Sequence, residues 1–351
     1  MLASVRALII AGLSALALTP AGGGQVRSAA SAPAYDDQPL SVMTYNIKGL
    51  PWPLASGREA ALERIADRLA LLRRERRQPH IVLMQEAFVP QAAAIAARAG
   101  YPYSVAGPHA ALRIPVTPER DDIAYLNGAF WYYGEQVGKS LGSGLLILSD
   151  YPITGSARLA FPDFACAGFD CLANKGALLA ELRVPGIGAV SVVDTHLNAR
   201  RAAGVPVARS QRAFERQAEL LADFVRAQVP AGRPLVLGGD MNIGGDPERR
   251  RAFFGHFARV GLGFVAPPLG GLKRALRQQA RIDAPTRSDL AQADRHGKDW
   301  LFARGTGNAP LPVASGRVPF GAEPRGEPLS DHYGYQIGYA IRRAPTRAPT
   351  A

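Results

Sequence analysis

The chain contains the stretch RPLVLGGDMNIGGDP at residues 233–247, and the interpretation of the whole sequence depends on it. Residues 235–237 are apolar and predict a short buried strand, after which the chain turns through two glycines. Asp240 and Asn242 follow, with one residue between them. Glycine, aspartate and asparagine all tolerate tight turns, so the pattern alone is compatible with a simple strand end. The rest of the chain has to decide between a turn and a functional site.

The composition predicts a packed, soluble protein. Of the 351 residues, 47% are hydrophobic and 20% are charged, which is sufficient for a core and too polar for several membrane spans. No internal repeat and no Ser- or Pro-rich linker divides the middle of the chain. We therefore expect one catalytic domain over residues 37–343 and a disordered tail over residues 344–351.

The net charge of +12 would attract polyanions, either nucleic acid or anionic lipid headgroups. Arginine dominates the basic residues, and stretches such as RLALLRRERR predict solvated helix surface. Charge therefore does not choose between these partners.

Residues 1–36 have the pattern of a secretory signal peptide followed by a disordered leader. Arg6 precedes the apolar run ALIIAGLSALAL, which Pro20 and small residues follow. The run is shorter than the ~20 apolar residues that a membrane-spanning helix needs. We therefore expect a periplasmic or secreted protein, with a retained anchor as the alternative.

The only two cysteines are Cys166 and Cys171, in the stretch CAGFDC. In an exported chain such close spacing favours a small disulfide loop over a metal site, which would need more ligands. We predict a bond between them.

Hydrophobic periodicity predicts alternating strands and helices. The predicted strands cover residues 40–47, 80–87, 144–149, 175–184, 188–197, 235–237, 299–303 and 333–341. The predicted helices cover residues 57–77, 90–100 and 208–228. Residues 107–141 show no clear period, and the basic stretch before residue 299 is ambiguous.

Polar side chains stand where these strands end or begin. They are Asn46, Glu86, His196, Asp240, Asn242, Asp331 and His332. Each one alone could be a cap or a turn, but together they indicate one shared cleft. Carboxylates and amides suit a hard cation such as Mg²⁺, and two histidines suit a base and an oxyanion stabiliser. The set predicts metal-assisted attack of water on a phosphate ester.

The sequence resembles the endonuclease/exonuclease/phosphatase superfamily, and within it most closely the secreted neutral sphingomyelinase C branch. The motifs that carry the resemblance occur in the family's order: TYNIKG, LMQEAF, GSGLLILSDYPI, NKG, DTHL, GGDMN, DWLF and SDHYG. The resemblance implies an α/β fold, a four-layer sandwich of two mixed β-sheets flanked by helices. It also implies a phosphodiesterase that uses Mg²⁺, with Mn²⁺ or Co²⁺ as substitutes.

The same resemblance implies a metal side of the site. Glu86 corresponds to the family's main Mg²⁺ ligand, Asn46 to the amide that supports metal and phosphate, and Asp331 to an adjacent carboxylate on the metal side. Lys175, five residues after Asp170 in DCLANKG, would contact the phosphate. The alternative for Lys175 is an exposed lysine at the start of a strand.

The resemblance also implies a catalytic side. His332 corresponds to the general base and Asp299 to the acid that fixes its tautomer. Asp240 would orient the attacking water, and Asn242 would donate to a phosphoryl oxygen. His196 would stabilise the pentacovalent phosphate or the leaving oxygen. On this interpretation the residues after the opening strand hold water and phosphate.

Three functions remain open. The first is an exported phosphodiesterase that cleaves a phospholipid headgroup, with residues 130–133 (FWYY) as an interfacial foot or, alternatively, as part of the core. The family branch has an aromatic hairpin before its Ser-Asp-His motif, where this chain offers only Phe320. The second is a secreted endonuclease that tracks nucleic acid with residues 271–281, GLKRALRQQAR. The third is a binding protein without activity. We expect a monomer with no obligate protein partner.

Overall fold

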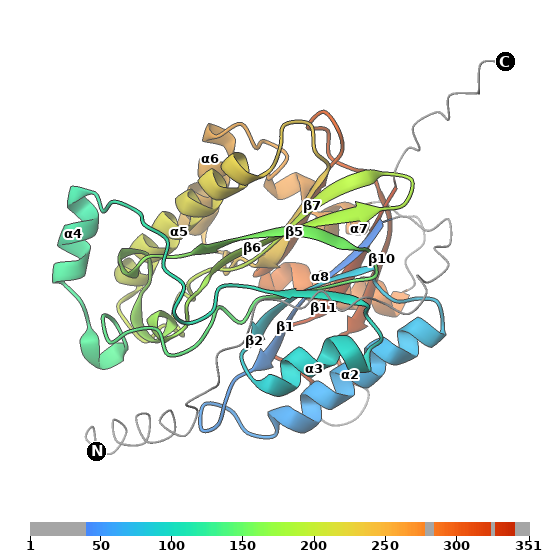
Figure 1. Cartoon of the computed structure of the whole chain (residues 1–351), viewed down its shortest axis with the longest axis horizontal. Helices are drawn as coiled ribbons and strands as arrows, with labels where there is room; N and C mark the ends of the chain where they lie inside the picture. Colours follow the sequence, from blue (N-terminus) through green and yellow to red (C-terminus); the bar gives the residue numbers. More distant parts are fainter. Residues whose placement is uncertain (1–39, 278–283, 324–326, 341–351) are drawn as a thin grey trace.

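The computed structural model describes residues 40–277, 284–323 and 327–340, which form two β-sheets packed face to face (Figure 1). The predicted signal peptide, leader and C-terminal tail lie outside the described residues. So does part of the basic stretch 271–281. Among the residues described, no helix is both long and apolar enough to cross a membrane.

The larger sheet has six strands. Their order is β10 (Val313–Phe320), β11 (Gly334–Tyr339), β1 (Leu40–Gly49), β2 (Ile81–Ala87), β4 (Leu146–Ser149) and β3 (Tyr103–Ala106). The smaller sheet has five strands. Their order is β5 (Ile153–Ala160), β6 (Gly176–Val184), β7 (Gly188–His196), β8 (Leu235–Asp240) and β9 (Asp299–Arg304). The predicted pair of mixed sheets is confirmed.

Each sheet contains one parallel pair, β1 with β2 and β7 with β8, and its other neighbours are antiparallel. Parallel strands need a crossover, usually a helix. Here α2 (Arg58–Arg74) connects the first pair and α5 (Val207–Gln228) the second. A crossover of this kind brings the carboxyl ends of both strands to one edge, where the predicted site residues stand.

Successive side chains along β1 point to opposite faces of the sheet and therefore enter different layers of the sandwich. Val42 lies in the core between the two sheets, whereas Met43, Tyr45 and Ile47 pack in the cluster formed with α2 and α3 (Pro90–Arg98). Both faces of β1 are therefore covered, and every residue of the strand except Lys48 is buried.

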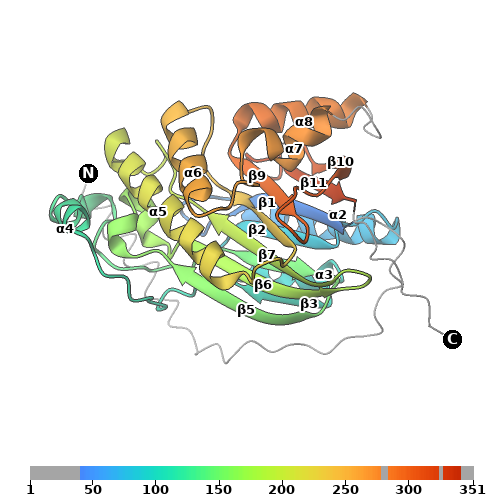
Figure 2. The ribbon, with the colours of Figure 1, turned by 90° about the horizontal axis from the view of Figure 1, so that it is seen from above.

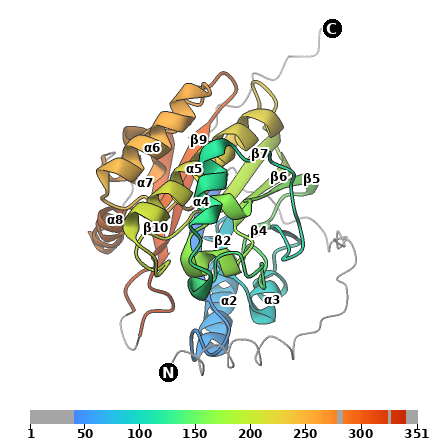
Figure 3. The same cartoon turned by 90° about the vertical axis from the view of Figure 1, so that its left-hand side faces the viewer.

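Helices cover the outer faces of both sheets and complete the four layers (Figure 2). α5 and α6 (Pro247–Arg259) pack on the five-stranded sheet, with Phe214 and Phe253 in the shared core. α7 (Gly271–Arg277) and α8 (Ala284–His296) pack beside β9 and β10 instead. α4 (Arg120–Asn127) stands in front of the strands in the end-on view (Figure 3). The described residues also include four short 3-10 helices: η1 (Trp131–Tyr133), η2 (Asp163–Ala165), η3 (Gly168–Leu172) and η4 (Pro267–Leu269).

The two glycines of the opening stretch do not form a turn, so that interpretation was wrong. Gly238 and Gly239 are paired with both β7 and β9, and β8 continues to Asp240. A Cβ at Gly238 would lie 2.5 Å from Leu301 and 2.8 Å from Leu83, which belongs to the other sheet. Glycine here lets the two sheets approach closely.

The sequence prediction also missed three strands, β3, β5 and β10. All three are edge strands. An edge strand is covered less completely than a central one, so its sequence mixes polar and apolar residues and lacks a clear period. The sequence prediction also missed α4, which lies within residues 107–141, and α6 to α8, which lie in the ambiguous region before residue 299. The helix predicted over residues 57–77 ends at Arg74.

Candidate active site

The carboxyl ends of the two parallel pairs meet at one place. Asn46 and Glu86 come from β1 and β2, and His196 and Asp240 come from β7 and β8. The Asn46 amide nitrogen donates to Glu86 Oε1 at 2.8 Å and to Asp240 Oδ2 at 3.1 Å. One amide therefore joins the two sheets and brings two carboxylates together.

Asp240 is the centre of this group and is buried. Its Oδ2 lies 3.4 Å from His196 Nε2 and 3.7 Å from His332 Nε2. Its Oδ1 accepts the backbone N–H of Asn242 at 3.0 Å. Burial alone would raise the pKa of Asp240, but His332, His196 and Lys175 hold it at about 2. The carboxylate is therefore charged and can accept a hydrogen bond from water.

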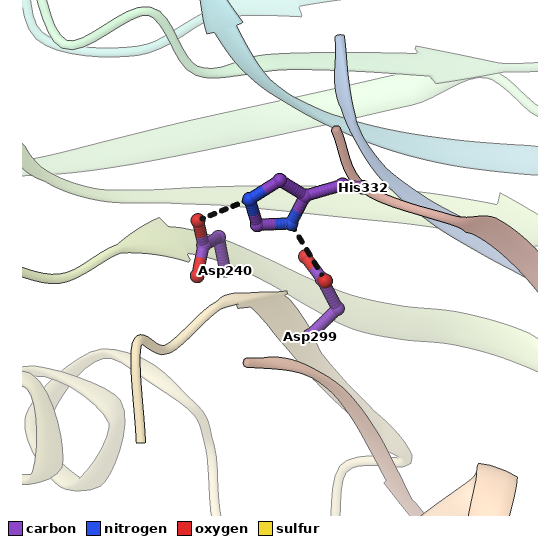
Figure 4. A group of neighbouring side chains, drawn as sticks. All are labelled: Asp240, Asp299 and His332. Atoms are coloured by element: carbon purple, nitrogen blue, oxygen red, sulfur yellow. Dashed lines mark hydrogen bonds and ion pairs between the residues drawn. The ribbon is translucent and has the colours of Figure 1, made fainter. Parts of the chain in front are cut away.

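His332 lies between two carboxylates (Figure 4). Its Nδ1 is 2.8 Å from Asp299 Oδ2, which leaves Nε2 facing Asp240. Asp240 and Asp299 are register partners in β8 and β9, so the sheet itself presents them side by side. Burial opposes the charged imidazole, but Asp299 and Asp240 raise the pKa of His332 to about 10. Burial raises the pKa of Asp299, against the effect of His332.

Lys175 is buried, so the alternative of an exposed lysine was wrong. Its ammonium lies 2.9 Å from Asp170 Oδ2, 3.1 Å from His196 Nε2 and 3.2 Å from the carbonyl of Leu197. Burial and Lys175 together lower the pKa of His196 to about 3. His196 is therefore neutral at physiological pH. Contact of Lys175 with phosphate stays a prediction.

Two site residues have a strained backbone. Glu86 has φ of +58° and Asn242 has φ of +48°, both in the left-handed region. Asparagine tolerates this conformation, whereas for glutamate it costs on the order of 1–3 kcal/mol. The Asn242 amide nitrogen donates to the Leu197 carbonyl at 3.0 Å, which leaves its second hydrogen for another acceptor. Such strain is typical of positions where the direction of a side chain matters more than stability.

Asp331 stands apart from this buried group. Its carboxylate is exposed and lies 3.8 Å from the Lys48 ammonium. Its assignment as a metal ligand stays a prediction.

The donor set fits a hard divalent cation. Among the described residues, one group of three potential ligand atoms lies within 4.8 Å of one another, from Asp240, Asp299 and His332. Glu86 adds a further carboxylate whose pKa burial raises. Asp299 Oδ1 is buried and has no hydrogen-bond partner within the described part of the chain. Clustered carboxylate and amide oxygens are the ligands that Mg²⁺ prefers.

The aromatic residues 130–133 were interpreted either as an exposed interfacial foot or as part of the core, and the structure shows two of them exposed and two packed against the core. Phe130 and Tyr133 pack against the core, whereas Trp131 and Tyr132 are 50% and 54% exposed. Tyr133 also contacts the ring of Phe169, with centroids 5.6 Å apart. Phe169 precedes Asp170, the partner of Lys175, so the cluster and the site share one loop.

Sequence reasoning missed Trp52 and Leu54 in the loop after β1, which are 73% and 62% exposed. A signal was present in the sequence, because large apolar residues in a proline-rich loop directly follow the strand that carries Asn46. Phe320 offers no such surface. It is buried and stacks on Tyr45 at a centroid distance of 4.6 Å.

The predicted disulfide is confirmed, with Cys166 bonded to Cys171 and both sulfurs buried. The bond closes the loop that carries Phe169 and Asp170. The disulfide therefore fixes the segment that supports Lys175.

Comparison with known proteins identifies the family of the chain. The sequence profile of the Endonuclease/Exonuclease/phosphatase family matches residues 43–332. Among curated protein sequences, none matches the chain significantly.

Several solved structures share the fold. Sphingomyelinase C from Streptomyces griseocarneus is 21% identical, with a TM-score of 0.55, over 86% of this chain and 99% of that one. A mutant beta toxin from Staphylococcus aureus, with bound magnesium ions, is 18% identical at the same TM-score, 0.55, and the same coverage, 86% and 99%. TDP2 from D. rerio, complexed with single strand DNA product, is 15% identical with a TM-score of 0.53, over 87% and 100%. At such identities the likeness shows the fold.

Proposed function

Because the chain belongs to the endonuclease/exonuclease/phosphatase family, we propose that it is a metal-dependent phosphodiesterase with a sphingomyelinase C-like activity on phospholipid headgroups. The observation that carries the lipid part of the proposal is the exposure of Trp131 and Tyr132 on a segment that contacts the loop of Asp170. Amphipathic aromatic rings partition well into the interface of a bilayer.

The residues of the site divide the reaction between them. His332 is the general base: Asp299 and Asp240 raise its pKa, and a cation bound beside them would offset that charge, so that Nε2 would be unprotonated and could take the proton of the attacking water while Nδ1 stays bonded to Asp299. Asp240 orients that water, and the free hydrogen of the Asn242 amide meets a phosphoryl oxygen. The buried ammonium of Lys175 places positive charge beside His196, where negative charge grows on the phosphate.

Glu86 and Asn46 would hold the cation beside Asp240, to which the Asn46 amide joins Glu86, and Asp331 would add a carboxylate from outside this buried group. We propose Mg²⁺, with Mn²⁺ or Co²⁺ as substitutes, and the beta toxin structure with bound magnesium ions supports this choice. Such a cation, when bound, withdraws charge from a phosphate ester and lowers the pKa of a coordinated water.

We also propose that the enzyme is exported, acts as a monomer and meets its substrate at a membrane surface. The disulfide supports export, because such bonds persist in oxidising compartments. The exposed Trp52 and Leu54 would extend the apolar surface around the site.

The first test compares substrates. Purified protein is assayed with Mg²⁺ and with EDTA on sphingomyelin, phosphatidylcholine, plasmid DNA and bis(4-nitrophenyl) phosphate. We expect cleavage that requires Mg²⁺ and stops with EDTA, and we expect one of the two phospholipids to be cleaved fastest. Faster cleavage of DNA than of any lipid would favour the secreted endonuclease, which the DNA-bound TDP2 structure and the net charge of +12 keep as the second candidate.

The second test separates the surface from the chemistry. Trp131→Ala with Tyr132→Ala should lower cleavage of liposomal lipid while turnover of the soluble diester holds. Leu71→Ala is the matched control, because Leu71 is an exposed apolar residue near the carboxyl end of α2. Equal losses on both substrates would assign the two aromatic residues a structural role only.

A further inference from the structure

Arg249 is completely buried, at 0% exposure, and is the bulkiest of the fully buried side chains among the described residues. It lies in the first turn of α6, on the same buried stripe as Phe253 and Phe257. Its Cζ lies 4.3 Å from the centroid of the Phe214 ring. A guanidinium so completely removed from water is costly unless its donors are satisfied.

The two terminal nitrogens of Arg249 meet backbone carbonyls from three places in the chain, whereas its buried Nε has no hydrogen-bond partner among the described residues. Nη1 donates to Asn198 O and to Asn242 O, both at 2.8 Å. Nη2 donates to Ser210 O at 3.3 Å and to Ala199 O at 3.4 Å. Asn198 and Ala199 follow β7, Asn242 follows β8, and Ser210 lies in α5. One side chain therefore ties together both loops that leave the parallel pair.

These loops carry or contact the groups that are proposed to bind phosphate, the Asn242 amide and the Lys175 ammonium. The Asn242 amide donates to Leu197 O in the neighbouring loop, and Lys175 donates to the same carbonyl. Asn242 also holds a left-handed backbone, with φ of +48°. Its backbone carbonyl accepts from Arg249, so the guanidinium restrains the backbone that carries the Asn242 amide.

We infer that Arg249 is a positioning residue for phosphate, which acts by holding the carbonyls of Asn242 and Asn198 from behind the site. The inference rests on the proposed phosphodiesterase function. Arginine suits the task because its planar fork reaches several carbonyls at fixed angles, whereas the ammonium of lysine is a single point charge on a flexible stem. Burial lowers the pKa of Arg249 only to about 10, so the charge remains at neutral pH and favours an anion nearby.

The test is Arg249→Lys, which keeps the charge and loses the fork. Arg251→Lys is the matched control, because Arg251 lies in the same helix and is exposed. Turnover of bis(4-nitrophenyl) phosphate and inhibition by inorganic phosphate are measured for each. We expect R249K to lower kcat by up to about 10²-fold, as small misplacements of a positioned group do, and to weaken phosphate inhibition, with R251K unchanged.

A double-mutant cycle with Asn242→Ala distinguishes positioning from general damage. If Arg249 acts through Asn242, R249K should change kcat little in the N242A background. Additive losses in the cycle, or unchanged phosphate inhibition in folded R249K, would overturn the inference. If R249K does not fold, the cycle is run with Arg249→Gln, which removes the charge and most of the four hydrogen bonds; it should lower kcat alone and change it little in the N242A background. A wild-type protein that turns over no diester would refute the proposed function instead.

Discussion

The hydrogen bond between His332 and Asp299 allows a sharp test of the catalytic assignment. Asp299→Asn keeps the size of the side chain and removes the charge that lies 2.8 Å from His332 Nδ1. The amide can donate to Nδ1, which would move the ring proton to Nε2 and block the nitrogen that faces Asp240. Asp299 Oδ1 has no hydrogen-bond partner among the described residues, so no contact there would keep the amide oxygen, rather than the amide nitrogen, toward His332 Nδ1.

The size of the effect follows from this geometry. A hydrogen bond to a charged group contributes about 1.5–3 kcal/mol, which is about 10- to 10²-fold in rate if the transition state loses it. A wrong tautomer removes the base as well, and an acid–base group contributes about 10² to 10⁴-fold. We therefore expect kcat to fall by about 10² to 10⁴-fold. His332→Ala should fall in the same range with little loss of fold, and the double variant should be no slower than H332A.

The assay is kcat for bis(4-nitrophenyl) phosphate over a series of Mg²⁺ concentrations. If Asp299 only orients His332, kcat falls and the Mg²⁺ concentration for half-maximal activity stays unchanged. If Asp240, Asp299 and His332 together bind the cation, which their spacing within 4.8 Å allows, the Mg²⁺ requirement rises and high Mg²⁺ restores activity. That result, or an unchanged kcat in D299N, would refute the orienting role.

Three further predictions follow from single contacts. Glu86→Gln removes one ligand charge and should raise the Mg²⁺ concentration for half-maximal activity, whereas activity that survives EDTA unchanged would contradict the metal assignment. Cys166→Ser with Cys171→Ser opens a loop of sequence separation 5 and should lower the melting temperature modestly in calorimetry, whereas thiol labelling of the native wild type would contradict the bond. Burial would raise the pKa of Glu135, but Arg209 and two backbone N–H groups lower it below 4.5 overall. Its stabilisation is therefore present above about pH 4.5 and is lost as the pH falls through the folded pKa, so the difference in unfolding free energy between wild type and Glu135→Gln should shrink there. A difference that grows as the solution is acidified would contradict this.

The central strands could be predicted because both of their faces are covered. β2 and β8 begin with unbroken apolar runs, and β1 and β7 are buried along most of their length although they include polar residues. Each of the four strands carries a polar site residue at or near its carboxyl end. This pattern predicts four site residues: Asn46, Glu86, His196 and Asp240. The structure brings all four together, as the shared cleft required.

The sequence could not show what depends on contacts between distant segments. Gly238 resembles a turn residue until Leu83 of the other sheet is placed beside it. Lys175 and Arg249 resemble surface charges until their partners are known. Arg249 did leave a signal, because it lies four and eight residues before Phe253 and Phe257 on one helical face.

The two sheets meet through apolar side chains over most of their contact and through polar ones near the site. Beside the bond from Asn46 to Asp240, Gln85 donates to Asp194 at 2.7 Å across the same junction. Burial raises the pKa of Asp194 well above its usual value, and its Oδ2 has no hydrogen-bond partner within the described residues. Apolar residues of similar size would hold this end of the sandwich more firmly, because buried polar groups with unsatisfied atoms cost stability. The junction thus gives up stability where the proposed function places a water and a phosphate, which is the trade-off expected of an active site built into a packing interface.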